Sequence, residues 1–222
     1  MAELIDYAMM PPAGAGALHA QLADDIRARG YSVMPDALPW DLADCLATHV
    51  YAMEQSRFRR AGVGRRQDHR VNRFVRTDEI AWITGDTPAG ARWLSWAADL
   101  QQALNRLLLL GLFSFESHFA HYAPGRYYRR HYDAFRGSRT RVLSIVAYLN
   151  PHWHPDDGGE LVLYRDDDDR DGLRVTPHRG TVVAFLSEDF PHEVLPARRD
   201  RYSIAGWFRV NEGGALPGVS MP

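Results

Sequence analysis

The sequence predicts an α+β protein in which N-terminal helices support a double-stranded β-helix (jelly-roll) core of about eight antiparallel strands. Two observations lead to this class. Residues 15–111 contain long segments with apolar side chains at helical spacing, whereas residues 112–210 contain short β-rich runs separated by turn-forming residues. The later runs follow one another without intervening helices, which is typical of antiparallel sandwiches and jelly rolls.

Three helices are expected before residue 112, at residues 15–29, about 39–55 and 89–111. A short strand at 31–34 is expected between the first two. The first helix has an apolar stripe formed by Leu18, Leu22 and Ile26. The third has a longer apolar face, formed by Trp93, Trp96, Leu100, Leu104 and Leu108.

Residues 57–76 are rich in arginine and contain two glycines, which predicts a loop, and residues 76–83 are expected to form a strand or hairpin arm. The core strands then follow. They are expected at 113–123, 127–133, 141–150, 159–165, 173–177, 181–186, 193–197 and 202–210.

The chain is expected to be one integrated domain with three parts. The helices and an arginine-rich β-hairpin occupy residues 1–111, the jelly-roll core occupies 112–210, and a flexible tail occupies 211–222. The length of 222 residues is compatible with this arrangement.

The composition gives few indications of partners. The net charge is -2, which does not indicate binding to nucleic acid or a membrane surface. The only cysteine is Cys45, so no internal disulfide can form. The N-terminus lacks the features of a signal peptide, and the longest apolar run, 107–113, is too short to cross a membrane. We therefore expect a monomeric cytoplasmic protein.

A candidate metal site is formed by His131, Asp133 and His192. His131 and Asp133 are two positions apart in an expected strand, so their side chains would share one face. His192 lies at the start of a later expected strand. Two histidines and one carboxylate on one face of an ion form the facial triad of non-haem Fe(II) oxygenases. Because a chain with ten histidines can contain an H-x-D pair by chance, this pattern alone does not decide the function.

Arg201 adds a second observation. If the segment after His192 leaves the metal and re-enters the barrel, Arg201 would face the interior together with Ser203, Ala205 and Trp207. A buried arginine requires a partner, and a ligand carboxylate matches its fork of donors. An internal salt bridge is the alternative, although no carboxylate on the neighbouring expected strands is an obvious partner.

Several motifs, in order along the chain, resemble those of the prolyl-hydroxylase-like 2-oxoglutarate oxygenases. This family includes the oxygen-sensing prolyl hydroxylases and their bacterial relatives. The resembling segments are Arg76–Ile83, Tyr122–Gly125, Tyr128–Asp133, Val146–Asn150, Gly158–Leu161, Pro191–Pro196 and Arg201–Trp207. The resemblance covers roughly residues 57–209.

The resemblance implies roles for individual residues. His131, Asp133 and His192 would bind Fe(II), and Arg201 would bind the distal carboxylate of 2-oxoglutarate. The hydroxyl of Tyr148 would lie beside that carboxylate, and Tyr122 would lie near the iron-chelating end. The walls of the pocket would be Ala120, Val146, Leu161, Val194 and Trp207. Arg141 matches a position near the substrate, although an arginine at a strand start is often only solvated.

The resemblance also implies a reaction. Fe(II), 2-oxoglutarate and O2 would be used to hydroxylate prolyl residues of a protein or peptide, with release of succinate and CO2 and with ascorbate as an accessory reductant. A component of the translation machinery is a reasonable substrate to consider. A hydroxylase of a free amino acid or another small molecule is the alternative. Nucleic-acid demethylation is disfavoured, because a second arginine expected six positions after Arg201 is missing.

Four further features leave alternatives open. His118 stands where the family often has an apolar pocket residue, and it is either a core histidine or a hydrogen-bond partner near the site. Ala205 replaces a polar residue. Residues 57–76 are a solvated loop, a non-specific contact to nucleic acid or a lid over the substrate. His152, His154 and the acidic run 166–169 are interpreted as exposed loops.

Overall fold

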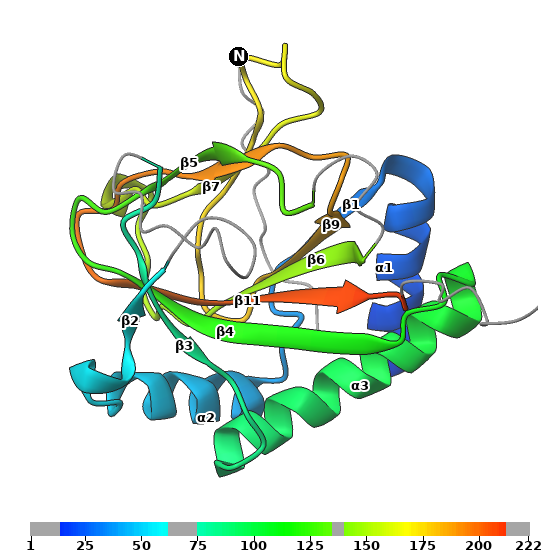
Figure 1. The fold of residues 1–222 in the computed structure, drawn as a ribbon, viewed down its shortest axis with the longest axis horizontal. Coiled ribbons are helices and arrows are strands. Elements are labelled where there is room, and N and C mark those ends of the chain that lie inside the picture. Colours follow the sequence, from blue (N-terminus) through cyan, green and yellow to red (C-terminus); the bar gives the residue numbers. More distant parts are fainter. Residues whose placement is uncertain (1–13, 62–74, 135–139, 212–222) are drawn as a thin grey trace, which may run out of the picture.

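Two antiparallel sheets pack against each other, and three helices cover the outer side of the larger sheet (Figure 1). The computed structural model describes residues 14–61, 75–134 and 140–211. Side chains from both sheets meet in a second apolar cluster, which includes Tyr122 and Tyr148 from the larger sheet and Leu161 and Val194 from the smaller one. The space between the two sheets therefore has an aromatic and aliphatic lining.

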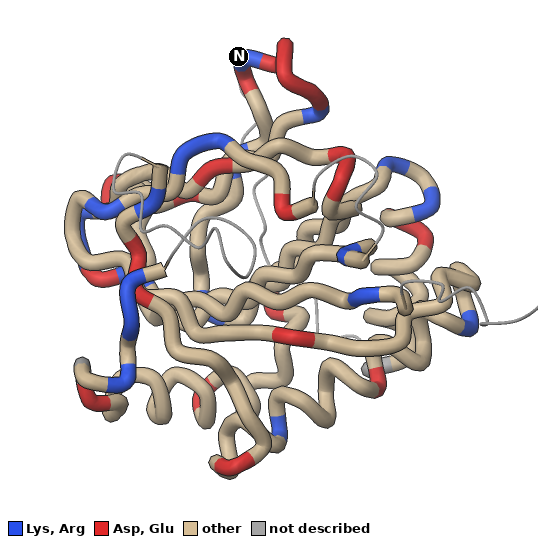
Figure 2. The backbone as a smooth tube through the Cα atoms, viewed as in Figure 1, with Lys and Arg blue, Asp and Glu red and all other residues tan. Residues whose placement is uncertain are grey.

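The larger sheet has seven strands in the order β1-β9-β6-β11-β4-β3-β2. Its strands are β1 (Tyr31–Met34), β2 (Arg59–Arg60), β3 (Glu79–Trp82), β4 (Ser114–Tyr122), β6 (Arg141–Tyr148), β9 (Val182–Leu186) and β11 (Arg201–Arg209). All of their pairings are antiparallel. The long strands β4, β6 and β11 lie at its centre, and Figure 2 shows that charged residues gather mostly at the strand ends, in the loops and on the helices.

The smaller sheet has four strands in the order β5-β10-β7-β8. They are β5 (Tyr128–His131), β7 (Leu161–Leu163), β8 (Leu173–Val175) and β10 (His192–Val194). His192 on β10 pairs with His131 on β5, so this pairing alone brings two of the expected metal ligands together.

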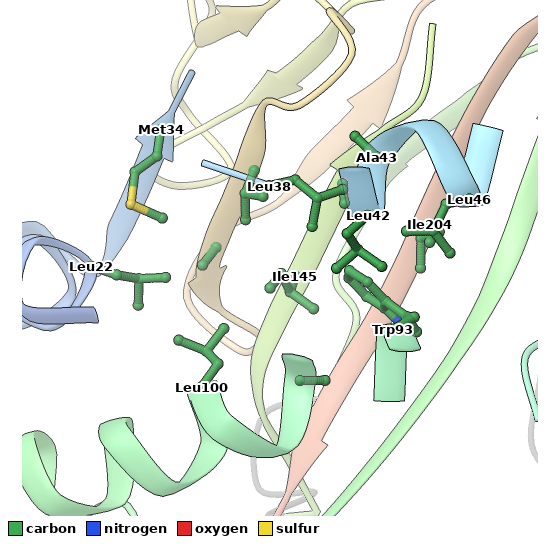
Figure 3. Close-up of a cluster of buried hydrophobic side chains, with 14 of the residues drawn as sticks. Leu22, Met34, Leu38, Leu42, Ala43, Leu46, Trp93, Leu100, Ile145 and Ile204 are labelled. Atoms are coloured by element: carbon green, nitrogen blue, oxygen red, sulfur yellow. The ribbon is translucent and has the colours of Figure 1, made fainter. Parts of the chain in front are cut away.

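The helices α1 (Ala15–Arg29), α2 (Trp40–Tyr51) and α3 (Pro88–Leu108) pack their apolar faces onto the larger sheet (Figure 3). Trp93 and Leu100 of α3 are fully buried beside Ile145 of β6. The Thr87 side chain caps α3 by accepting a hydrogen bond from the backbone N–H of Gly90. The elements η1 (Gln55–Arg57) and η2 (Pro155–Asp157) are short 3-10 helices.

The α+β class and the eight core strands from residue 112 onward are confirmed, as β4 to β11. Several expected bounds were too wide. The second helix ends at Tyr51, and β5 ends at His131, so Asp133 lies just beyond the strand that was expected to contain it. The expected lid within 57–76 lies mostly outside the described residues. No described helix is both long enough and apolar enough to cross a membrane.

Candidate active site

The register of the larger sheet determines which side chains share its inner face, because cross-strand partners point to the same side. On β4 these residues are Glu116, His118, Ala120 and Tyr122. On β11 their partners are Trp207, Ala205, Ser203 and Arg201, in that order. On β6 the same rows continue with Ser144, Val146 and Tyr148. The inner face therefore carries both charged and hydroxyl groups within an otherwise apolar space.

His131, Asp133 and His192 meet between the two sheets. The Nε2 atoms of His131 and His192 lie 3.7 Å and 3.6 Å from separate oxygens of Asp133. All three potential ligand atoms lie within 4.8 Å of one another, and no other group of three such residues was found in the described part of the chain. Two imidazoles and a carboxylate directed at one point form a facial donor set that suits Fe(II).

Backbone carbonyls determine which ring nitrogens of the two histidines can bind a metal. His131 Nδ1 lies 2.8 Å from the Arg129 carbonyl oxygen, and His192 Nδ1 lies 3.1 Å from that of Phe190. A carbonyl only accepts, so each Nδ1 carries the hydrogen and each Nε2 keeps its lone pair. Burial, followed by the nearby His131, lowers the pKa of His192 to about 4, which keeps its ring neutral at pH 7.

Asp133 is held as a carboxylate. Burial would raise its pKa, but His192, His131 and a hydrogen bond from Ser144 together lower the pKa well below its usual range. Ser144 Oγ donates to Asp133 Oδ2 over 2.7 Å. The carboxylate is therefore oriented by β6 although Asp133 itself follows β5.

A layer of stacked groups supports His131 from one side. The Tyr128 ring stacks on the His131 ring with 3.5 Å between centroids, and the Arg76 guanidinium lies 4.3 Å from the Tyr128 ring centroid. Arg76 donates two hydrogen bonds to the Asp78 carboxylate, over 2.8 Å and 2.6 Å. This ion pair is almost fully buried, with side-chain exposures of 12% and 0%.

Arg201 is buried among neutral groups. It is 1% exposed, and its guanidinium lies 5.0 Å and 5.2 Å from the ring centroids of Tyr122 and Tyr148. Its Nε donates to the Gly159 carbonyl oxygen over 2.8 Å, and Nη1 donates to Ser203 Oγ over 3.2 Å. Among the described residues, no carboxylate oxygen lies within 4.0 Å of a guanidinium nitrogen of Arg201. The cation therefore has donors left for an anionic ligand.

Two more polar groups of this face have no partner. The Tyr148 hydroxyl and Trp207 Nε1 are buried and form no hydrogen bond with any described residue. Burial raises the pKa of Tyr148 to about 12 against the opposing effect of Arg201, so the hydroxyl keeps its proton. Buried donors without partners are rare in folded proteins. The Tyr148 hydroxyl, beside Arg201, fits a pocket that receives a carboxylate ligand such as 2-oxoglutarate.

Arg141 contacts both the segment that carries Asp133 and the larger sheet. It pairs with Glu116 over 2.8 Å, donates to the Asp133 carbonyl oxygen over 3.3 Å, and lies 3.9 Å from the Trp207 ring centroid. The sequence suggested either a substrate contact or a solvated side chain. Arg141 is partly exposed and ion-paired, so it is more than a solvated side chain, and its contact with substrate stays a prediction.

The roles of Ser144, Tyr128 and the pair Arg76–Asp78 were not predicted from the sequence. Arg76, Asp78 and Tyr128 lie inside the resembling motifs, so the motifs could have indicated them. Ser144 lies outside these motifs and could not be predicted, because its hydrogen bond to Asp133 depends on how β6 meets the end of β5. His152 and His154 lie away from the triad, and the His154 side chain is 75% exposed, as expected for a loop.

Comparisons with known proteins agree with this geometry. Residues 117–209 match the family model of the 2OG-Fe(II) oxygenase superfamily. A crystal structure of a Pseudomonas putida prolyl-4-hydroxylase is similar to this chain, with a TM-score of 0.76 and 40% sequence identity over 87% of this chain and 99% of that chain.

Two further solved structures are similar. One is a prolyl hydroxylase in complex with a hypoxia inducible factor oxygen degradation domain peptide fragment, from Trichoplax adhaerens; its TM-score is 0.75 and its identity 27%, over 92% of this chain and 94% of that chain. The other is the viral collagen prolyl hydroxylase of Paramecium Bursaria Chlorella virus-1 in its 2OG complex. At 16% identity over 83% of this chain and 98% of that chain, and with a TM-score of 0.58, it supports the fold alone.

Proposed function

Because the chain belongs to the 2OG-Fe(II) oxygenases and resembles their prolyl 4-hydroxylases, we propose that it hydroxylates a prolyl residue of a protein substrate. The observation that carries this proposal is the 40% identity to a prolyl-4-hydroxylase over 99% of that chain. A second relative binds a peptide fragment, which supports a polypeptide substrate over a free amino acid.

The residues divide into two binding sets. His131, Asp133 and His192 would hold Fe(II) through two neutral imidazole nitrogens and one carboxylate oxygen. Arg201 would bind the distal carboxylate of 2-oxoglutarate with its unused N–H groups, and the Tyr148 hydroxyl would donate a further hydrogen bond. The ring faces of Tyr122 and Trp207 would form walls of this pocket.

Bound Fe(II) and 2-oxoglutarate supply the oxidation: O2 is consumed, succinate and CO2 are released, and one oxygen atom enters the substrate as a hydroxyl group. The protein orients these groups and excludes water. Ser144 holds the Asp133 carboxylate in position. Arg141 lies over the Trp207 ring beside the metal site, where it would contact the substrate.

The proposal is tested with purified protein, Fe(II), 2-oxoglutarate, ascorbate and a panel of blocked prolyl oligopeptides. We expect at least one peptide to stimulate succinate release and to gain the mass of one oxygen atom on its proline. Matched peptides with alanine in place of proline are the control. Stimulation by free proline or another amino acid, with none by any prolyl peptide, would establish the small-molecule alternative instead.

The natural substrate is sought by mass spectrometry of proteomes from cells with and without this protein. Proline oxidation that depends on the protein identifies the target, and components of the translation machinery are the first to examine. If the two proteomes show no difference in proline oxidation, the proposal is contradicted.

A further inference from the structure

His118 lies in the middle of the inner face of the larger sheet. It pairs with Trp82 of β3 on one side and with Ala205 of β11 on the other. These three side chains point to the same face, and β6 continues the row with Val146. Ala205 contributes only a methyl group and Val146 only an aliphatic side chain, so the imidazole is the one side chain in this row that can accept a hydrogen bond.

Two tryptophans flank the imidazole. Trp82 meets it edge-on with 5.3 Å between ring centroids, and Trp207 lies 5.4 Å away on the other side. Trp82 is 57% exposed, whereas His118 is 3% exposed and Trp207 is 8% exposed. The row therefore leads from the surface of the molecule toward the buried space that contains the metal ligands.

The hydrogen bonding of His118 leaves one ring nitrogen free. Its Nδ1 lies 3.2 Å from the Phe119 carbonyl oxygen, which can only accept, so Nδ1 carries the hydrogen. Burial, followed by the charge of Arg76, lowers the pKa of His118 to about 4, so the ring has a single hydrogen at pH 7. Its Nε2 is then an acceptor, and no described residue donates to it.

Trp207 supplies the complementary group. Its Nε1 is a buried donor with no partner among the described residues. The imidazole acceptor and this indole donor thus stand on neighbouring aromatic rings, 5.4 Å apart between centroids. Leaving the buried Trp207 N–H unsatisfied costs about 1–3 kcal/mol, so it points to a ligand that brings an acceptor, and His118 Nε2 can accept from the same ligand.

A backbone peptide group offers the matching donor and acceptor. We propose that His118 Nε2 accepts a hydrogen bond from a backbone N–H beside the target proline, and that Trp207 Nε1 donates to a neighbouring backbone carbonyl. His118 is then a specificity residue that selects polypeptide over free amino acid. This inference rests on the proposed function, because it requires a prolyl peptide in the site.

A purely structural role for His118 predicts a different result when the residue is replaced. A histidine that only fills space between two tryptophans would be replaceable by a side chain of similar volume without any effect on backbone recognition. The two cases are separated by changing one atom of the ligand together with one residue of the protein. The coupling between these changes reports the contact itself.

The probe is the blocked prolyl oligopeptide that best stimulates succinate release, and the analogue replaces the amide N–H after the proline with an ester oxygen. Each is titrated without oxygen into protein carrying Mn(II) and 2-oxoglutarate, and Kd is read from tryptophan fluorescence. A second ester analogue, at the amide before the residue that precedes proline, tests the other flanking N–H. An ester at the end of the peptide is the control.

In the unmodified protein we expect one flanking ester to bind about 5- to 10-fold more weakly than the amide, as the loss of one hydrogen bond predicts. In His118→Met this ratio should fall to about one, and His118→Gln, which restores an acceptor, should recover part of it. An equal ratio in the unmodified protein and His118→Met overturns the inference while the proposed function stands. If no prolyl peptide is bound or oxidised, the proposed function fails and this inference fails with it.

Discussion

Replacement of Arg201 by methionine tests the co-substrate site most directly. Methionine retains much of the length and the apolar stem but removes the charge and every N–H group. Arg201 is 1% exposed and, among the residues that the structure describes, donates only to neutral oxygens of Gly159 and Ser203. We therefore expect a bound carboxylate to be its charged partner, and the loss of such a buried pair costs about 3–5 kcal/mol.

That free energy corresponds to a rise of more than about 100-fold in the Kd for 2-oxoglutarate. If 2-oxoglutarate is present at about 100 times the Kd of the unmodified protein, binding stabilises the fold by about 2.7 kcal/mol. For a chain of this size the melting temperature should rise by about 5–10 °C. In Arg201→Met the same concentration should stabilise by about 0.4 kcal/mol or less, which is a rise of about 1 °C.

The assay is thermal unfolding with Mn(II) in place of Fe(II), so that no turnover occurs. Each variant is compared with itself without 2-oxoglutarate, and this removes any effect of the substitution on the fold. Ser203→Ala is the matched control, because it removes one neutral contact of Arg201 and leaves the charge. A shift in Arg201→Met equal to that of the unmodified protein would show that the carboxylate binds elsewhere.

Three other changes have expected outcomes. Ser144→Ala removes the hydrogen bond to Asp133 Oδ2, so the affinity for Mn(II), followed by calorimetric titration, should fall about 10- to 100-fold; unchanged affinity would mean that Ser144 does not orient the carboxylate. Asp78→Asn leaves the buried Arg76 without its counter-ion, so urea unfolding should report a loss of about 3–5 kcal/mol, whereas Asp41→Asn, at the exposed pair with Arg92, should change stability little. Equal losses in these two variants would contradict the role of burial. Burial lowers the pKa of His118 to about 4, below its unfolded value of 6.5, so the unfolded state binds more protons between these pH values. The free energy of unfolding should therefore fall by up to about 3 kcal/mol as the pH drops from 6.5 to 4. His118→Met should lack this part of the pH dependence, and identical pH profiles for the two proteins would mean that the imidazole is in water.

The sequence was sufficient for the order of elements, because helical and strand periodicities are local properties. Apolar residues at helical spacing predicted α1 and α3, and short β-rich runs predicted all eight core strands. The strand ends were less predictable. Asp133 was assigned to a strand by its two-residue spacing from His131, yet β5 ends at His131, and Asp133 reaches the metal site from the segment that follows.

Contacts between distant segments could not be predicted from local sequence patterns, for a physical reason. The bond from Ser144 to Asp133 depends on the relative placement of β6 and the end of β5, which no local pattern encodes. The acidic run 166–169 was interpreted as fully solvated, but Asp169 is 9% exposed and accepts backbone hydrogen bonds from Arg165, Asp171 and Gly172. Turn geometry, not composition, buries this carboxylate.

Two buried arginines in this site show how a binding residue can be distinguished from a structural one. Arg76 and Arg201 both lie against tyrosine rings and both are largely removed from water. Arg76 donates twice to the carboxylate of Asp78, so its charge is already neutralised within the protein. Within the described part of the chain, Arg201 donates only to neutral oxygens, and it has N–H groups left. Because an unpaired buried cation is unfavourable, and because the neighbouring Tyr148 hydroxyl also has no partner among the described residues, we expect the counter-ion of Arg201 to be a bound ligand.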